Sequence, residues 1–130
     1  MLVFQQKPSM LSVLFGGQAP EFSRIRGWLN SEPLTLVGLR GKVVLLDFWT
    51  FSCVNCVRTL PHMKQLHMMY GGENFVLVGV HTPEFEFEKK RENVADAVKR
   101  FRIEYPVAID SDNATWAIVR EPLLATTDVG

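Results

Sequence analysis

The sequence is poor in cysteine, in net charge and in long apolar runs, and each shortage excludes a class of protein. Two cysteines among 130 residues are too few for the disulfide framework of a small secreted scaffold. Fourteen basic residues balance fourteen acidic ones, so there is no electrostatic footprint for nucleic acid, and we expect no nucleic-acid partner. The remaining composition, 47% hydrophobic and 22% charged, predicts a soluble domain with one core.

The first eighteen residues do not have the composition of a targeting signal. Their most apolar stretch, Leu11 to Phe15, is interrupted by Ser12 and is too short for a secretory signal or a membrane span. We therefore expect residues 1–18 to be a leader or tail segment and residues 19–130 to form one domain.

Hydrophobic patterning along the chain predicts alternating strands and helices. The expected strands are residues 34–36, 43–49, 75–80, 107–109 and 123–127, and the expected helices are residues 53–70, 94–101 and 114–119. The continuous apolar run 43–49 suits a central strand that is buried on both faces. This order predicts an α/β fold with a central, mainly parallel sheet flanked by helices.

Both cysteines directly follow the central strand, at the expected start of a helix. A thiolate at a helix amino terminus is stabilised by the helix dipole and by backbone N–H groups, so Cys53 is the expected nucleophile. Cys56 lies one helical turn later on the same face and is the expected resolving thiol. The pair predicts thiol-disulfide exchange through a mixed disulfide, with protein disulfides or dithiols as substrates and no cofactor.

Asp47 is an acid inside the apolar strand VVLLDFW. A buried carboxyl group destabilises the fold unless it is paired or protonated. We expect it to lie beneath Cys56, with a pKa raised by desolvation, and to exchange the proton that resolution requires. The alternative is a structural carboxyl group that is hydrogen-bonded to backbone or to a buried water.

The segment VVLLDFWTFSCVNCVRTLP resembles the active-site segment of thioredoxin-fold thiol-disulfide oxidoreductases, with Asp47, Trp49, Cys53, Cys56 and Pro61 at the family's spacings. Together with APEF, WLNSEPLTLVGLRGK, VLVGVHTPEFEFEK and YPVAIDSDNATW, it is similar to the TlpA-like domain of DipZ-type proteins. This resemblance implies a thioredoxin-like fold and a membrane-embedded redox partner. It also implies a location on the extracytoplasmic side of a bacterial membrane, with the cytoplasm as the alternative.

The resemblance also implies a substrate groove and includes departures from the family pattern. Trp49, Ser52 and Pro122 are the expected substrate-binding residues, with Pro122 as the candidate for the family's cis proline. Ser52 stands where thioredoxins carry a tryptophan, and Thr59 stands where some relatives carry an acid. The chain ends at Gly130, before the family's last strand and helix, so we expect a domain that is truncated at its carboxyl end.

Metal binding is the main alternative that does not involve catalysis. Zinc needs four ligands, and only His62, His67 and His81 are available to complete a site with the two cysteines, at unsuitable positions. The methionines of the predicted helix suggest a copper-delivery protein that uses Cys53 and Cys56, although methionine at helical spacing usually fills a core. We expect no metal site.

Two further stretches have alternative interpretations. The Thr50-to-Cys53 segment contains the TxxC part of a peroxiredoxin motif, so a thiol peroxidase that uses Cys53 is a second enzyme hypothesis, although Leu46 replaces the motif's proline. In the run from Glu84 to Glu92, phenylalanines alternate with acids. There we expect Phe85 and Phe87 to face inward and the charges to be solvated.

Overall fold

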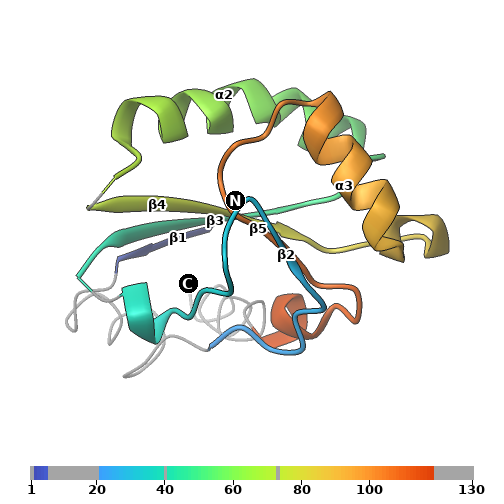
Figure 1. The fold of residues 1–130 in the computed structure, drawn as a ribbon, viewed down its shortest axis with the longest axis horizontal. Helices are drawn as coiled ribbons and strands as arrows, with labels where there is room; N and C mark the ends of the chain where they lie inside the picture. The colour runs from blue at the N-terminus through green and yellow to red at the C-terminus, as the bar shows by residue number, and fades with distance from the viewer. Residues whose placement is uncertain (1, 6–20, 40, 73, 119–130) are drawn as a thin grey trace, which may run out of the picture.

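The computed structural model describes residues 2–5, 21–39, 41–72 and 74–118 (Figure 1). Its elements are β1 (Leu2–Gln5), β2 (Trp28–Leu29), the 3-10 helix η1 (Val37–Leu39), β3 (Val43–Trp49), α2 (Val54–Tyr70), β4 (Phe75–His81), the 3-10 helix η2 (Glu86–Lys89), α3 (Arg91–Arg100) and β5 (Val107–Ile109). Residues 114–118 are also helical.

Five strands form one sheet in the order β1-β3-β4-β5-β2. The three central strands are parallel, and the edge strands β1 and β2 pair antiparallel with β3 and β5. The predicted α/β architecture is therefore confirmed, whereas the sheet, predicted to be mainly parallel, is mixed, with parallel central strands and antiparallel edges. Strand β3 has a neighbour on each side, so it is an interior strand of the sheet. The two cysteines follow directly after its carboxyl end.

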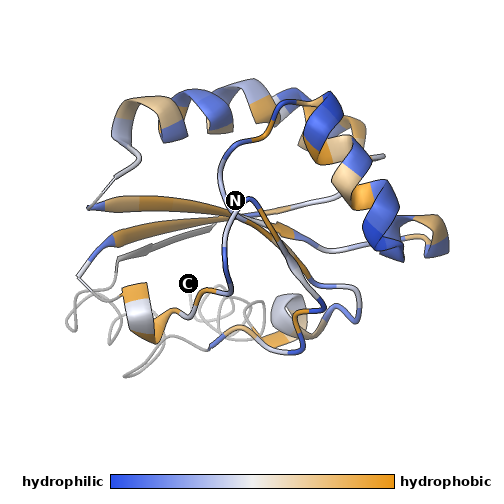
Figure 2. Ribbon diagram, viewed as in Figure 1, coloured by the Kyte–Doolittle hydropathy of each residue, from blue (hydrophilic) through white to orange (hydrophobic). Residues whose placement is uncertain are grey.

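The sheet lies between two layers (Figure 1). Helices α2 and α3 cover one face, and the segment 21–39 with the helical residues 114–118 covers the other. Apolar colouring follows β3 and β4 along their length, as expected for a sheet buried on both faces, whereas both helices carry apolar and polar colouring (Figure 2). The core beneath α2 and α3 consists of Leu45, Trp49, Leu60, Met63, Leu77, Val94, Val98, Ile103, Tyr105, Val107 and Ile109.

Two predicted features of the chain's first third differ in the structure. Residues 34–36 are not a strand: the backbone N–H of Leu36 donates to the Glu21 carboxylate (2.7 Å) instead of a neighbouring strand. The strand at that sheet edge is β2. Residues 2–5, predicted to belong to a leader or tail segment, form the edge strand β1. The domain boundary at residue 19 stays a prediction.

The elements around the cysteines agree with the predictions. Strand β3 spans the predicted 43–49, and α2 begins at Val54 with Cys53 as its N-cap and ends at Gly71. Residues 107–109 form β5, and α3 buries Val94, Ala97 and Val98. The predicted strand 123–127 and Pro122 lie outside the described residues.

Gly79 on β4 pairs with Asp47 on β3 and leaves room for two aromatic rings. A Cβ atom at this position would lie 3.0 Å from Nε1 of Trp49 and 3.1 Å from Cε1 of Tyr105. We therefore predict that Gly79→Ala lowers the free energy of unfolding by about 1–3 kcal/mol, because the packed rings must shift. Urea denaturation measures this. Gly41→Ala, where a Cβ atom meets nothing within 4 Å, tests backbone strain alone, since its φ is +89°.

Candidate active site

Cys53 occupies the N-cap position of α2. Its backbone is extended (φ −84°, ψ 115°), and its sulfur accepts a hydrogen bond from the backbone N–H of Cys56 (3.3 Å). An N-cap side chain that accepts from the first turn satisfies an otherwise unpaired donor and places negative charge at the positive end of the helix dipole. The Cys53 sulfur is therefore held by a backbone donor at the positive end of α2.

Cys56 lies one turn into α2, partly buried, and packs against the core beneath the helix. Burial, the hydrogen bond with Cys53 and the charges of Cys53 and Asp47 together raise the pKa of the Cys56 thiol to about 11. Cys56 is thus held as a thiol at neutral pH. The two sulfurs are unbridged in this structure.

Asp47 is 5% exposed on β3, and no described group donates a hydrogen bond to its Oδ2 atom. Burial raises the pKa of this carboxyl group from 3.8 to about 6. Asp47, Asn55, Cys56 and Thr59 line one opening of about 190 Å³, together with Phe48. The structure therefore places Asp47 and Cys56 beside one small opening, and the proton exchange expected between them stays a prediction.

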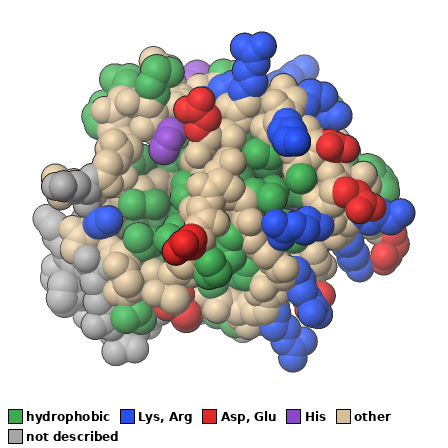
Figure 3. Space-filling view, viewed as in Figure 1, with side chains coloured by type: hydrophobic (Ala, Val, Ile, Leu, Met, Phe, Trp, Pro, Cys, Tyr) green, Lys and Arg blue, Asp and Glu red, His purple; other side chains and the backbone are tan. Residues whose placement is uncertain are grey.

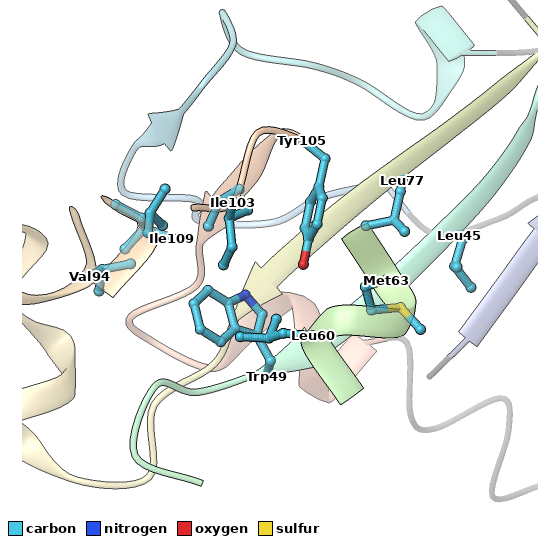
Figure 4. Close-up of a cluster of buried hydrophobic side chains, with 11 residues drawn as sticks. Leu45, Trp49, Leu60, Met63, Leu77, Val94, Ile103, Tyr105 and Ile109 are labelled. Carbon is cyan, nitrogen blue, oxygen red and sulfur yellow. The ribbon is translucent and has the colours of Figure 1, made fainter. Parts of the chain in front are cut away.

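Trp49 is 2% exposed and packs between the sheet and α2, where the Tyr105 hydroxyl points toward its indole ring (Figure 4). Nε1 of Trp49 and the Tyr105 hydroxyl are buried without a hydrogen-bond partner among the described residues. Burial and the charge of Asp47 raise the pKa of Tyr105, so this hydroxyl stays protonated. Trp49 is thus a core residue, and the contact with substrate expected for it stays a prediction.

A wider groove of about 240 Å³ also adjoins Cys56. Its lining combines the end of β3 and Cys56 with the segment after β4 and the segment after β5: Phe48, Trp49, Thr50, Cys56, Thr82, Pro83, Glu84, Asn113 and Trp116. The groove is open to solvent and mainly apolar, which suits an extended polypeptide better than a small charged ligand.

His81 and Glu88 also contact the loop that leads to Cys53, and the sequence analysis assigned neither residue to the redox site. Nε2 of His81 accepts the backbone N–H of Phe51 (3.3 Å), and burial lowers the pKa of this imidazole to about 4. Oε2 of Glu88 accepts from the hydroxyls of Thr50 and Ser52. Ser52, the residue before Cys53, is thus hydrogen-bonded to a buried carboxylate.

The segment from Glu84 to Glu92 contradicts the prediction made for it. Phe85 and Phe87 are 56% and 49% exposed, whereas Glu88 is fully buried. The segment is a 3-10 turn and not a strand, so alternation does not sort its side chains to two faces. One signal was present: Glu88 lies three residues after the N-cap Phe85, the position of a capping-box glutamate, but phenylalanine replaces the usual serine or threonine.

The exposed apolar side chains lie in separate places on the surface. Figure 3 shows green patches among the tan surface, with lysine and arginine gathered on one side of that face. Phe51 stacks on His81 (centroids 5.4 Å apart) and meets Phe87 edge to face (5.8 Å). Phe87 of η2 is therefore in contact with Phe51 of the loop before Cys53.

The residues proposed for metal binding do not gather into one set. Met63 is buried in the core, whereas Met68 and Met69 are exposed near the other end of α2 from the cysteines. Within the described ranges, no group of three or more histidine, cysteine or acidic residues is arranged to hold a metal ion. In the same part of the chain, no helix is both long and apolar enough to cross a membrane.

Known proteins are similar to this chain in sequence and in fold. The AhpC/TSA family profile matches residues 15–118. Protein DipZ of Mycobacterium bovis is 46% identical over 107 residues, which are 80% of this chain and 15% of DipZ. Thiol-disulfide oxidoreductase ResA of Bacillus cereus is 30% identical over 95 residues, 73% of this chain and 51% of ResA. The chain therefore spans about half or less of the length of these relatives.

Among solved structures, a putative thioredoxin from Neisseria meningitidis superposes with a TM-score of 0.63 at 30% identity, covering 77% of this chain and 63% of that one. The predicted resemblance to DipZ-type, thioredoxin-fold proteins is thereby confirmed. The cysteine pair lies at the start of α2, after the central strand of the sheet. The family profile covers most of the chain, and one of the relatives is named for thiol-disulfide exchange. This chain therefore has a thioredoxin-like fold and belongs to the AhpC/TSA family.

Proposed function

We propose that this chain is a thiol-disulfide oxidoreductase that exchanges electrons with protein disulfides through Cys53 and Cys56. The observation that carries the proposal is the pairing of two unlike thiols at the start of α2. The Cys53 sulfur is held by the Cys56 N–H at the helix terminus, and the Cys56 thiol is held protonated by burial. Thiolate is the nucleophile in disulfide exchange, so this difference assigns the order of attack.

In the reductive direction, the Cys53 thiolate attacks one sulfur of the substrate disulfide. The substrate S–S bond breaks, a mixed disulfide forms, and the departing substrate sulfur leaves as a thiolate. Cys56 then loses its proton and attacks the Cys53 sulfur, which releases the second substrate thiolate and leaves the Cys53–Cys56 disulfide. The substrate gains two electrons and the enzyme loses two.

Asp47 is the proposed acceptor of the Cys56 proton. A pKa of about 6 leaves its carboxyl group mostly ionised at neutral pH, and the two groups line the same small cavity. In the mixed disulfide, the Cys53 sulfur carries no charge, so its contribution to the raised pKa of Cys56 disappears. Deprotonation of Cys56 thus becomes easier at the step that needs it.

The groove beside Cys56 is the proposed binding site for the substrate chain, with Trp49 in its lining and Ser52 and Pro122 as further proposed contacts. Its mainly apolar lining supports a polypeptide substrate. By similarity to DipZ, we also propose a membrane-embedded redox partner and an extracytoplasmic location.

Stopped-flow oxidation of the reduced protein tests this function against the peroxidase alternative. We expect rapid loss of both thiols with a protein disulfide and slow oxidation of Cys53 by hydrogen peroxide. The reason is that the Thr50 hydroxyl, which would position a peroxide, donates to Glu88 instead. Peroxide consumption faster than disulfide exchange would favour the peroxidase. A copper-delivery protein would instead bind Cu(I) tightly and show slow exchange in both assays.

A further inference from the structure

Three successive residues connect β3 to Cys53, and each is held by a buried titratable side chain. The hydroxyls of Thr50 and Ser52 both donate to Oε2 of Glu88, the latter at 2.5 Å. Between them, the Phe51 N–H donates to Nε2 of His81 at 3.3 Å. The conformation of the loop before the nucleophile therefore depends on β4 and η2, which are remote from it in sequence.

Glu88 is fully buried, and its second oxygen is also used. Oε1 accepts the backbone N–H groups of Glu84 (2.9 Å) and Phe85 (3.0 Å). In the described part of the chain, no lysine or arginine lies within ion-pair distance of this carboxylate. Burial alone would raise its pKa, but the four hydrogen bonds outweigh burial and lower the pKa to about 2. Glu88 thus keeps a full negative charge, and it contacts Ser52, the residue directly before the nucleophile.

We propose that Glu88 is a positioning residue for the dithiol: it directs the Thr50 and Ser52 hydroxyl hydrogens away from the Cys53 sulfur and thereby limits stabilisation of the Cys53 thiolate. The inference rests on the proposed function of Cys53. With the Ser52 hydrogen directed to Glu88, the hydrogen bond that the Cys53 sulfur accepts comes from the Cys56 backbone. One carboxylate thereby moderates the reactivity of the neighbouring thiol.

Glu88→Gln reverses this arrangement by a simple constraint on donors. The N–H groups of Glu84 and Phe85 can only donate, so the glutamine carbonyl oxygen must face them. The amide nitrogen then faces Thr50 and Ser52, whose hydroxyls become acceptors. Their hydrogens are released, and Ser52 directly precedes Cys53 in the chain. The substitution also removes the negative charge, so both changes favour the thiolate.

The test measures iodoacetamide alkylation of Cys53 at pH 7 in a Cys56→Ser background, where one thiol remains and the backbone N–H of residue 56 is kept. We expect Glu88→Gln to alkylate about tenfold faster, as removal of a nearby charge predicts. The matched control is Glu86→Gln, which removes the same charge from a side chain of the same turn that is 89% exposed. It should stay within about twofold of the parent. Unchanged or slower alkylation of Glu88→Gln would overturn the proposal.

Ser52→Ala separates hydrogen direction from charge and needs no substitution of Glu88. Because the Ser52 hydrogen does not serve the sulfur, Ser52→Ala alone should alkylate within about twofold of the parent. Added to Glu88→Gln, it should remove at least half of the gain, on a logarithmic scale. A several-fold loss in Ser52→Ala alone, or a gain that persists in full without Ser52, would contradict the assigned role. Should Glu88→Gln fail to fold by circular dichroism, the Ser52→Ala measurement still decides.

The same variants can be read in the two-cysteine protein. We expect Glu88→Gln to shift the equilibrium with glutathione about tenfold toward the reduced protein, which for a two-electron couple is about 30 mV. Alkylation needs no protein substrate, so the two hypotheses fail separately. A parent protein that reduces no disulfide would refute the proposed function, and unaltered alkylation would refute the role of Glu88.

Discussion

Cys56→Ser is expected to accumulate mixed disulfides between Cys53 and substrate proteins, and Cys53→Ser is expected to reduce exchange below detection. The first variant keeps the nucleophile at the N-cap of α2 and removes the thiol that resolves the intermediate. The second keeps only Cys56, a partly buried thiol whose pKa is raised mainly by burial, so little of it is thiolate at pH 7. Non-reducing electrophoresis followed by mass spectrometry of trapped adducts measures both.

Alkylation of the reduced parent protein gives an independent check on the order of attack. At neutral pH, Cys53 should react at least tenfold faster than Cys56, because the thiolate is the reactive form. Peptide mapping after brief exposure to iodoacetamide separates the two rates. Equal rates would contradict the assignment of Cys53 as nucleophile, and mixed disulfides trapped in Cys53→Ser would reverse it.

Asp47→Asn is expected to slow resolution of the mixed disulfide by roughly 10²-fold while the protein stays folded, since a positioned general base contributes about this much. Stopped-flow mixing of reduced protein with a disulfide substrate separates the fast attack by Cys53 from the slower release step. Only the release step should change. Asp96→Asn, an exposed position on α3, removes the same charge as a control. Equal release rates in Asp47→Asn and the parent from pH 6 to 9 would leave Asp47 with a structural role.

The stability of the Asp47→Asn protein should change in the opposite direction to its activity. The pKa of Asp47 is raised from 3.8 to about 6, so the folded state binds the proton more tightly than the unfolded state does. Ionisation of Asp47 therefore destabilises the parent as pH rises from about 4 to about 6, by up to roughly 3 kcal/mol. At pH 8, Asp47→Asn should unfold at higher urea concentration than the parent, and near pH 4 the difference should vanish. A gain that is the same at both pH values would contradict the buried-charge explanation.

Local patterns determined the part of the fold that contains the cysteines. A continuous apolar run indicated β3, and the three-residue spacing of Cys53 and Cys56 at the start of a helix specified one turn on one face. These features depend on neighbours within about ten residues. The position of Asp47 likewise indicated a buried carboxyl group, because the apolar residues on both sides of it in VVLLDFW predict a strand that is buried on both faces.

Long-range contacts decided the rest. Residues 34–36 have a strand-like sequence, yet Leu36 pairs with the Glu21 carboxylate, and β2 forms at Trp28–Leu29 because β5 offers it an edge. Glu88 resembles its solvated neighbours in sequence. Its burial follows from the meeting of η2 with the loop 50–52, 36 residues away, where two hydroxyls and two N–H groups compensate for its desolvation. Sequence alone therefore predicted the two thiols of the candidate site, whereas only the tertiary structure revealed the buried carboxylate that holds the preceding loop, because hydrogen bonds between distant segments leave no local pattern.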